Sequence, residues 1–80
     1  PDDLTRIEGI GPKTQEVFQQ AGIQSFQQLA DASAEELDHI LDEAGLQLGD
    51  PTTWPRQARL AAEEKWEELK QLQDELIGGR

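Results

Sequence analysis

The segment from Ile7 to Lys13 combines the residue types of a tight turn with a positive charge. Gly9 and Gly11 stand two residues apart, and glycine permits either a positive φ or the close approach of another group. Pro12 has the fixed φ that suits the first turn of a helix. A helix that begins directly after such a turn has backbone N–H groups without partners, so its N-terminus suits an anion. Because Lys13 adds a cation there, the segment predicts a contact with phosphate.

The order apolar, any residue, Gly, apolar, Gly resembles the turn of the helix-hairpin-helix family, whose second helix often begins with Pro-Lys or Pro-Ser. The resemblance covers residues 3–22. Family members bind the sugar-phosphate backbone of DNA or RNA without reading its sequence. The segment looks like the first hairpin of a tandem version, as in repair nucleases, recombinase N-terminal domains and some ribosomal-protein extensions. The whole chain also resembles a bacterial domain related to the SAM-like helix-three-turn-helix of flap nucleases.

The resemblance implies which residues contact the nucleic acid. Those in the turn and at the start of the following helix are Gly9, Ile10, Gly11, Lys13 and Thr14. It also implies a monovalent cation, K⁺ or Na⁺, that bridges backbone carbonyls and a phosphate, and it implies no other cofactor. The matching carbonyls belong to Thr5, Ile7 and Ile10. Glu8 departs from the family pattern, and an acid beside a phosphate should weaken binding.

The second half of the chain repeats this pattern only in part. Its two glycines, Gly45 and Gly49, stand four residues apart, but Trp54-Pro55-Arg56 again places a proline and then a base at a helix start. If two hairpins pack symmetrically, Arg56 would share a face with Lys13, with Arg6 and Arg59 nearby, as a small positive surface. The alternative is that this proline only starts a helix and that the arginines are ordinary surface residues.

The charge balance opposes nucleic-acid binding. Seventeen acids and seven bases give the 80 residues a formal net charge of −10. Nucleic-acid-binding surfaces are usually basic, because phosphate contacts supply most of the affinity. Moreover, no Lys or Arg occurs between Thr14 and Pro55, a window with eight acids. Two explanations stay open: a salt-rich cytoplasm that screens charge, or an acidic surface that binds a basic protein.

Helical periodicity extends along the chain and no segment alternates like a strand, which predicts an all-α fold. We expect a single compact domain of five to six short helices over residues 1–80. It would contain one good helix-hairpin-helix motif at residues 3–22 and a degenerate second one at about residues 34–77. The spacing permits one helix from Trp54 to Ile77, but the resemblance favours a break near residues 63–65.

Capping residues mark the expected helix ends. Asp3, Ser25, Ser33 and Thr53 are the expected N-caps, and Gly22 should end a helix in the left-handed conformation. A loop is expected from Gly45 to Thr53, and a stop at Gly78 and Gly79. The predicted core comprises Leu4, Ile7, Ile10, Val17, Phe18, Ile23, Phe26, Leu29, Leu37, Ile40, Leu41, Leu46, Trp54, Leu60, Trp66 and Leu69. Either tryptophan could stack on a base, but core positions suit both better.

Other chemistry is poorly supported. The chain has no cysteine, which argues for a reducing cytoplasmic setting and against thiolate metal sites. His39 is the only histidine, so we expect it on the surface rather than on a transition metal. The acids between residues 35 and 43 should spread over a solvent face instead of converging as catalytic groups. No apolar run reaches the ~20 residues that cross a bilayer. Because the sequence begins with Pro1, we expect a fragment of a longer protein.

These observations predict a non-catalytic, sequence-independent module that binds DNA or RNA backbone weakly as part of a larger protein. The alternative is a protein-interaction or structural module whose acidic surface meets a basic partner and binds no nucleic acid. No membrane and no small-molecule substrate are expected in either case. An enzyme is disfavoured, because flap nucleases carry their acidic metal cluster in a separate domain.

Overall fold

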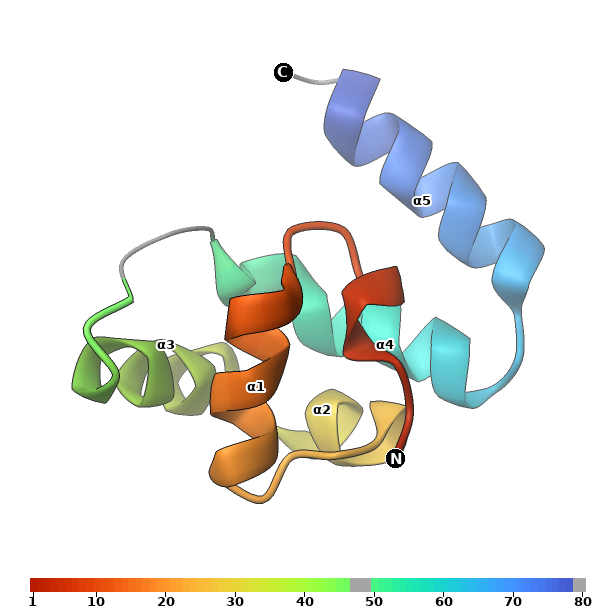
Figure 1. Ribbon diagram of the computed structural model, residues 1–80. Helices are drawn as coiled ribbons and strands as arrows, with labels where there is room; N and C mark the ends of the chain where they lie inside the picture. Colours follow the sequence, from red (N-terminus) through yellow and green to blue (C-terminus); the bar gives the residue numbers. More distant parts are fainter. Residues whose placement is uncertain (47–49, 79–80) are drawn as a thin grey trace.

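Seven helical segments make up the part of the chain that the computed structural model describes, residues 1–46 and 50–78 (Figure 1). In chain order they are η1 (Leu4–Arg6), α1 (Pro12–Gln20), α2 (Phe26–Asp31), α3 (Ala34–Glu43), η2 (Pro51–Thr53), α4 (Trp54–Ala62) and α5 (Trp66–Gly78). The five α-helices, with no strand among the described residues, confirm the all-α prediction. Over the same residues, none of the helices combines the length and hydropathy of a bilayer-spanning segment.

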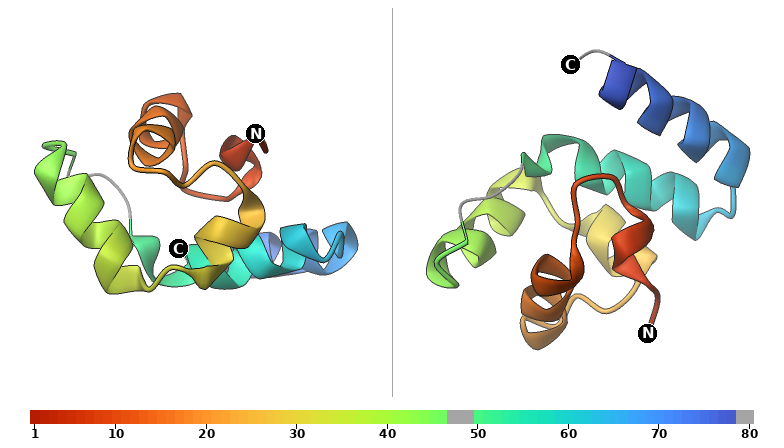
Figure 2. Two further views of the ribbon diagram at one scale, coloured as in Figure 1. Left: turned by 90° about the horizontal axis from the view of Figure 1, so that it is seen from below. Right: turned by 45° about the horizontal axis from the view of Figure 1, so that its top comes forward.

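The helices form a layer with the hairpin on one side of it. Figure 2, left, shows η1 and α1 together on one side of α2, α3 and α4. The most extensive helix contact is that of α2 with α4, and Ala58 and Ala61 of α4 are 0% and 2% exposed. Small side chains let two helix backbones approach closely, which explains why these alanines belong to the core although they were not predicted there.

Most predicted core residues are buried in one cluster with Trp54 and Phe18 in edge-to-face contact, their ring centroids 5.7 Å apart. The partly buried residues packed against the cluster include Ile23, Ile40, Leu46, Leu60 and Trp66. The prediction that Val17 belongs to the core is wrong, because this residue of α1 is only half-buried. Ala30 and Leu72 are buried without having been predicted.

The caps predicted for three helices are present. The Asp3 carboxylate accepts hydrogen bonds from the hydroxyl and then the amide of Thr5, which lower the Asp3 pKa. Ser33 forms a complete capping box with Glu36. Ser25 Oγ accepts from the Gln28 amide at 3.0 Å, but the Gln28 side chain accepts from the preceding amide of Gln24 instead of completing a box.

The predicted cap at Thr53 is wrong. Its side chain accepts no cap hydrogen bond, because the chain is already helical there as part of η2. Asp50 caps that earlier turn by accepting from the Thr52 amide at 3.1 Å, a hydrogen bond that lowers the Asp50 pKa. The predicted loop is therefore wrong over Pro51–Thr53. Its middle, with Gly49 of the second glycine pair, lies outside the described residues, as does Gly79 of the predicted C-terminal stop.

The break between α4 and α5 confirms the prediction of two helices. The chain turns at Glu64, whose φ of 59° is left-handed, and the Lys65 amide donates to the Leu60 carbonyl at 2.9 Å. Gly22 also has its predicted left-handed conformation, with φ 93°. After this break, α5 runs back beside α4 and diverges from it towards its C-terminal end (Figures 1 and 2).

Ser33→Ala should lower the free energy of unfolding by about 1 kcal/mol, because the Glu36 amide loses its capping acceptor. In a domain of this size, that corresponds to a fall of roughly 4–8 °C in melting temperature. Gln20→Ala, an exposed site on α1, is the control and should change stability little. An unchanged melting temperature for Ser33→Ala would refute the contribution of the box.

Candidate nucleic-acid interface

Two buried isoleucines hold the turn between η1 and α1. Ile7 and Ile10 are 1% and 4% exposed, and the Ile10 amide donates to the Ile7 carbonyl at 3.1 Å. The backbone between them reverses direction at Gly9, whose φ is 102°. The apolar–x–Gly–apolar pattern thus anchors both ends of the turn in the core and raises its middle above α4.

Gly9 also lies where no side chain fits. A Cβ at this position would be 2.7 Å from Nε1 of Trp54. That indole N–H donates to the Glu8 carbonyl at 3.0 Å, so the ring sits directly beneath the turn. Gly9 is therefore required both by its backbone conformation and by the close approach of Trp54.

Gln57 fastens the turn to α4 and was not anticipated as a key residue. It is fully buried, and its Oε1 accepts from the Glu8 amide at 2.7 Å. Its Nε2 donates to the Glu8 carbonyl at 3.3 Å and to Thr53 Oγ1 at 3.1 Å. The sequence signal was a polar residue on the same helical face as Trp54 and Ala61, a buried position that demands hydrogen-bond partners.

Gln73 brings α5 into this network. Its Nε2 donates to the Arg6 carbonyl at 2.8 Å and to Gln57 Oε1 at 3.0 Å. The backbone of the hairpin is consequently held by amide side chains from two helices. This arrangement fixes the direction in which α1 begins.

The N-terminus of α1 is open. Gly11 is its N-cap, with extended backbone (φ −92°, ψ 179°) and no side chain to accept from the first amides. The first backbone amide of α1 to find a partner is that of Gln15, which donates to the Gly11 carbonyl at 3.0 Å. The earlier amides, of Lys13 and Thr14, have no protein acceptor among the described residues. A Cβ built on Gly11 meets nothing within 4 Å, so no other part of the described chain crowds the N-cap of α1.

The predicted contact residues contribute differently at this N-terminus. Ile10 and Thr14 have buried side chains and offer only backbone groups, whereas the Lys13 side chain is 70% exposed. Lys13 Nζ is 3.9 Å from a Glu16 carboxylate, itself 57% exposed. Such a pair is solvated and contributes little, so the ammonium group stays available to an anion.

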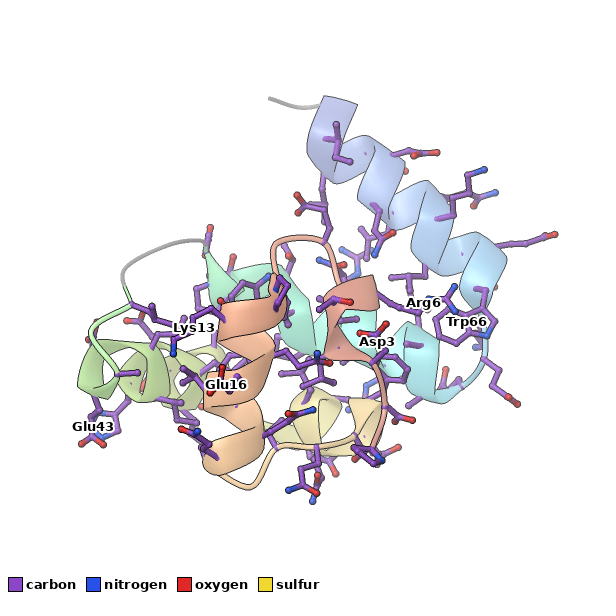
Figure 3. All side chains as sticks on the ribbon, in the orientation of Figure 1. Asp3, Arg6, Lys13, Glu16, Glu43 and Trp66 are labelled. Atoms are coloured by element: carbon purple, nitrogen blue, oxygen red, sulfur yellow. The ribbon has the colours of Figure 1, made fainter. Side chains whose placement is uncertain are left out.

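Of the other predicted bases, Arg6 lies apart from Lys13. Figure 3 shows Lys13 on the α3 side of α1 and Arg6 on the other side of the hairpin, against Trp66. Arg56 and Arg59 are exposed on α4, one turn apart and therefore on one face. The buried residues of α4, including Trp54 and Ala58, define its opposite face.

The three carbonyls expected to hold a cation keep lone pairs that no hydrogen bond within the described residues uses. The Ile7 carbonyl accepts one hydrogen bond, from Ile10, and those of Thr5 and Ile10 accept none from the described residues. Carbonyl oxygens are hard ligands of the kind that alkali cations prefer. The chemistry of these oxygens is compatible with K⁺ or Na⁺, and the cation site stays a prediction.

Other candidate groups have structural explanations. His39 is 71% exposed and lies 3.1 Å from a Glu43 carboxylate on the same helix. The acids of α3 are all exposed, as expected for a solvated face, and the described residues contain no cluster of three or more metal-ligating side chains. Trp54 is in the core as predicted, whereas Trp66 is only partly buried.

Comparison with known families supports this reading of the hairpin. Residues 4–62 match the family described as the RS2/RL21/YNQ2 HHH domain, a helix-hairpin-helix domain found in ribosomal proteins. Searches of curated proteins and of solved structures gave no significant match. Domains of this type typically bind nucleic acid and are usually non-catalytic. Because the match includes the hairpin, α4 and most of the core, the chain belongs to this helix-hairpin-helix family.

Proposed function

We propose that this domain is a sequence-independent nucleic-acid-binding module that contacts backbone phosphate at the N-terminus of α1. The observation that carries the proposal is Gly11: it caps α1 without a side chain and has open space where a Cβ would be. The amides of Lys13 and Thr14 would donate to phosphate oxygens, and the Lys13 ammonium would pair with them. A monovalent cation on the carbonyls of Thr5, Ile7 and Ile10 would supply positive charge that the acidic chain lacks.

The binding mode follows from this small number of positive groups. Gly9 and Ile10 would shape the turn, while Arg56 and Arg59 would be peripheral contacts on α4, the helix we assign to a degenerate second hairpin. About two to four phosphates would be neutralised, so affinity should be weak and fall with salt at roughly −0.9 per phosphate. The single domain of residues 1–80 would then tether a larger protein to DNA or RNA.

Gly11→Ala should reduce binding at low salt by about tenfold while the fold is retained, because its methyl group would occupy the space in front of the free amides. Lys13→Glu should reduce binding as well and lower the salt slope by about one. Titration with duplex and single-stranded DNA, followed through the amide signals of residues 9–14, measures both effects.

Lys65→Glu is the matched control, since it makes the same charge change in the α4–α5 turn, where Lys65 pairs with Glu63 at 3.2 Å. It should reduce binding less than Lys13→Glu. The proposal fails if nucleic acid shifts none of these amide signals, or if Lys65→Glu and Lys13→Glu have equal effects.

A second candidate is favoured by the uninterrupted acidic surface of α3. Its exposed acids are Glu35, Glu36, Asp38, Asp42 and Glu43. Such a surface suits a basic protein partner. Co-purification of a partner that survives nuclease treatment would support this function, whereas loss of the partner on treatment would argue for bridging nucleic acid.

A further inference from the structure

A groove with a positive lining lies between η1 and α5, away from Lys13. It has a volume of about 360 Å³ and is lined by Arg6, Trp66, Glu67, Leu69, Lys70 and Gln73. Two cations thus face one acid in a protein of net charge −10. By contrast, a hollow between α3 and η2 has three carboxylates, those of Glu35, Asp38 and Asp50. Only the first of these two hollows suits an anion.

The Arg6 side chain is already held in position. Its guanidinium carbon lies 4.0 Å from the centroid of the Trp66 ring, as Figure 3 shows for the two residues. Trp66 in turn meets Phe26 edge-to-face, with ring centroids 5.7 Å apart. A guanidinium stacked on an aromatic face keeps its in-plane N–H donors free, and these match the oxygens of phosphate. The positive charge of Arg6 contributes to the lowered pKa of Asp3, but no ion pair of Arg6 occurs within the described part of the chain.

The other wall of the groove comes from one face of α5. Trp66, Leu69, Lys70 and Gln73 recur at spacings of three and four, so they share that face. Leu69 is 3% exposed and anchors the helix, whereas Lys70 is exposed to solvent. The hydrogen bond from Gln73 to the Arg6 carbonyl fixes α5 against η1. Both walls are therefore positioned before any ligand arrives.

We propose that this groove binds one nucleotide of a single-stranded nucleic acid, with its phosphate between Arg6 and Lys70. The proposal rests on the proposed function but places a second contact outside the hairpin. The sugar or base would lie against the part of the Trp66 ring that Arg6 and Phe26 leave exposed, and against the aliphatic stem of Lys70. A single strand is favoured because a paired base cannot leave its stack to reach the indole. Most of the lining belongs to α5, beyond the residues that match the family.

The test uses an oligouridine of about ten nucleotides and a duplex of equal length at low salt. In the unaltered protein, the oligouridine should shift the indole Nε1–H signal of Trp66 and the Nε–H signal of Arg6 more than the duplex does. Arg6→Gln combined with Lys70→Gln should weaken oligouridine binding about fivefold and reduce the salt slope by about 0.7, the value for one phosphate of a single strand. Because loss of Arg6 could disturb the fold, Lys70→Gln is also tested alone. Lys70 is exposed, so this variant should keep the fold and still weaken oligouridine binding.

Lys13→Gln separates this site from the hairpin. It should weaken the amide shifts of residues 9–14 and preserve the Trp66 and Arg6 shifts. The groove variants should instead weaken the Trp66 shift and preserve the amide shifts of residues 9–14. Shifts confined to residues 9–14 would overturn the groove and leave the hairpin function standing. If a polyglutamate peptide of equal charge shifts Trp66 and Arg6 as strongly as oligouridine does, the groove is a protein-binding site and the proposal is wrong.

Discussion

Replacing Gly9 with alanine is expected to destabilise the protein by about 3 kcal/mol, more than any other glycine substitution described below. The φ of 102° disfavours an L residue, at a cost of about 1–3 kcal/mol. The new methyl group would also meet Trp54 Nε1 at 2.7 Å, and overpacking of this kind typically costs about 1–3 kcal/mol more. Since an 80-residue domain has a total stability of roughly 4–12 kcal/mol, urea unfolding should reveal a large loss.

Gly22 and Gly11 provide graded controls for this prediction. Gly22 has a φ of 93° but open space around it, so Gly22→Ala should show conformational strain alone, about 1 kcal/mol. Gly11 has extended backbone and open space, and Gly11→Ala should cost less than about 1 kcal/mol. Equal losses for Gly9→Ala and Gly22→Ala would show that Trp54 does not press against the turn.

Gln57→Leu is expected to be comparably destabilising, by about 3 kcal/mol, although leucine has a similar volume and is apolar. The substitution removes the acceptor of the Glu8 amide and a donor to the Glu8 carbonyl. Removing one partner of a hydrogen bond in a partly buried position costs about 1–3 kcal/mol, and here two such hydrogen bonds are lost together. Thermal unfolding gives the loss, and faster hydrogen exchange of the Glu8 amide would locate it.

The matched control is Gln20→Leu, because Gln20 is exposed on α1 and the same change there should alter stability by less than about 0.5 kcal/mol. Nucleic-acid binding by Gln57→Leu, measured below its melting temperature, should also weaken, since the hairpin loses two of its hydrogen bonds to α4 and keeps that of Trp54. Wild-type stability for Gln57→Leu would contradict the arrangement of the turn on α4.

The sequence predicted the hairpin well because local patterns determine it. Gly9, Pro12 and the spacing of Ile7 and Ile10 define the turn without reference to the rest of the chain. The caps at Asp3 and Ser33 were predictable for the same reason, since each accepts from amides two or three residues ahead. Thr53 failed as a cap because Asp50 and Pro51 start a helical turn earlier, and two competing N-cap patterns lay side by side.

The contacts between segments that are distant in the sequence were harder to predict. Nothing in the pattern around Gln57 or Gln73 says that their partners lie in the hairpin, 49 residues away for Gln57 and 67 for Gln73. The same holds for the bases: symmetric packing of two hairpins would bring Arg6 near Lys13, but in the structure the Arg6 side chain lies over the Trp66 ring of α5. Tertiary packing decides which basic side chains share a face of the protein, and the sequence pattern alone does not determine this.

Helix α5 packs on the domain although it lies beyond the residues that match the family. The family match stops at residue 62, but Leu69 and Leu72 are buried and Gln73 hydrogen-bonds both Gln57 and the hairpin backbone. A fragment trimmed to the matched residues would lose those contacts and expose the part of the core that Leu69 and Leu72 cover. The packed core of this chain therefore extends beyond the family signature, and α5 is part of the scaffold that holds the hairpin.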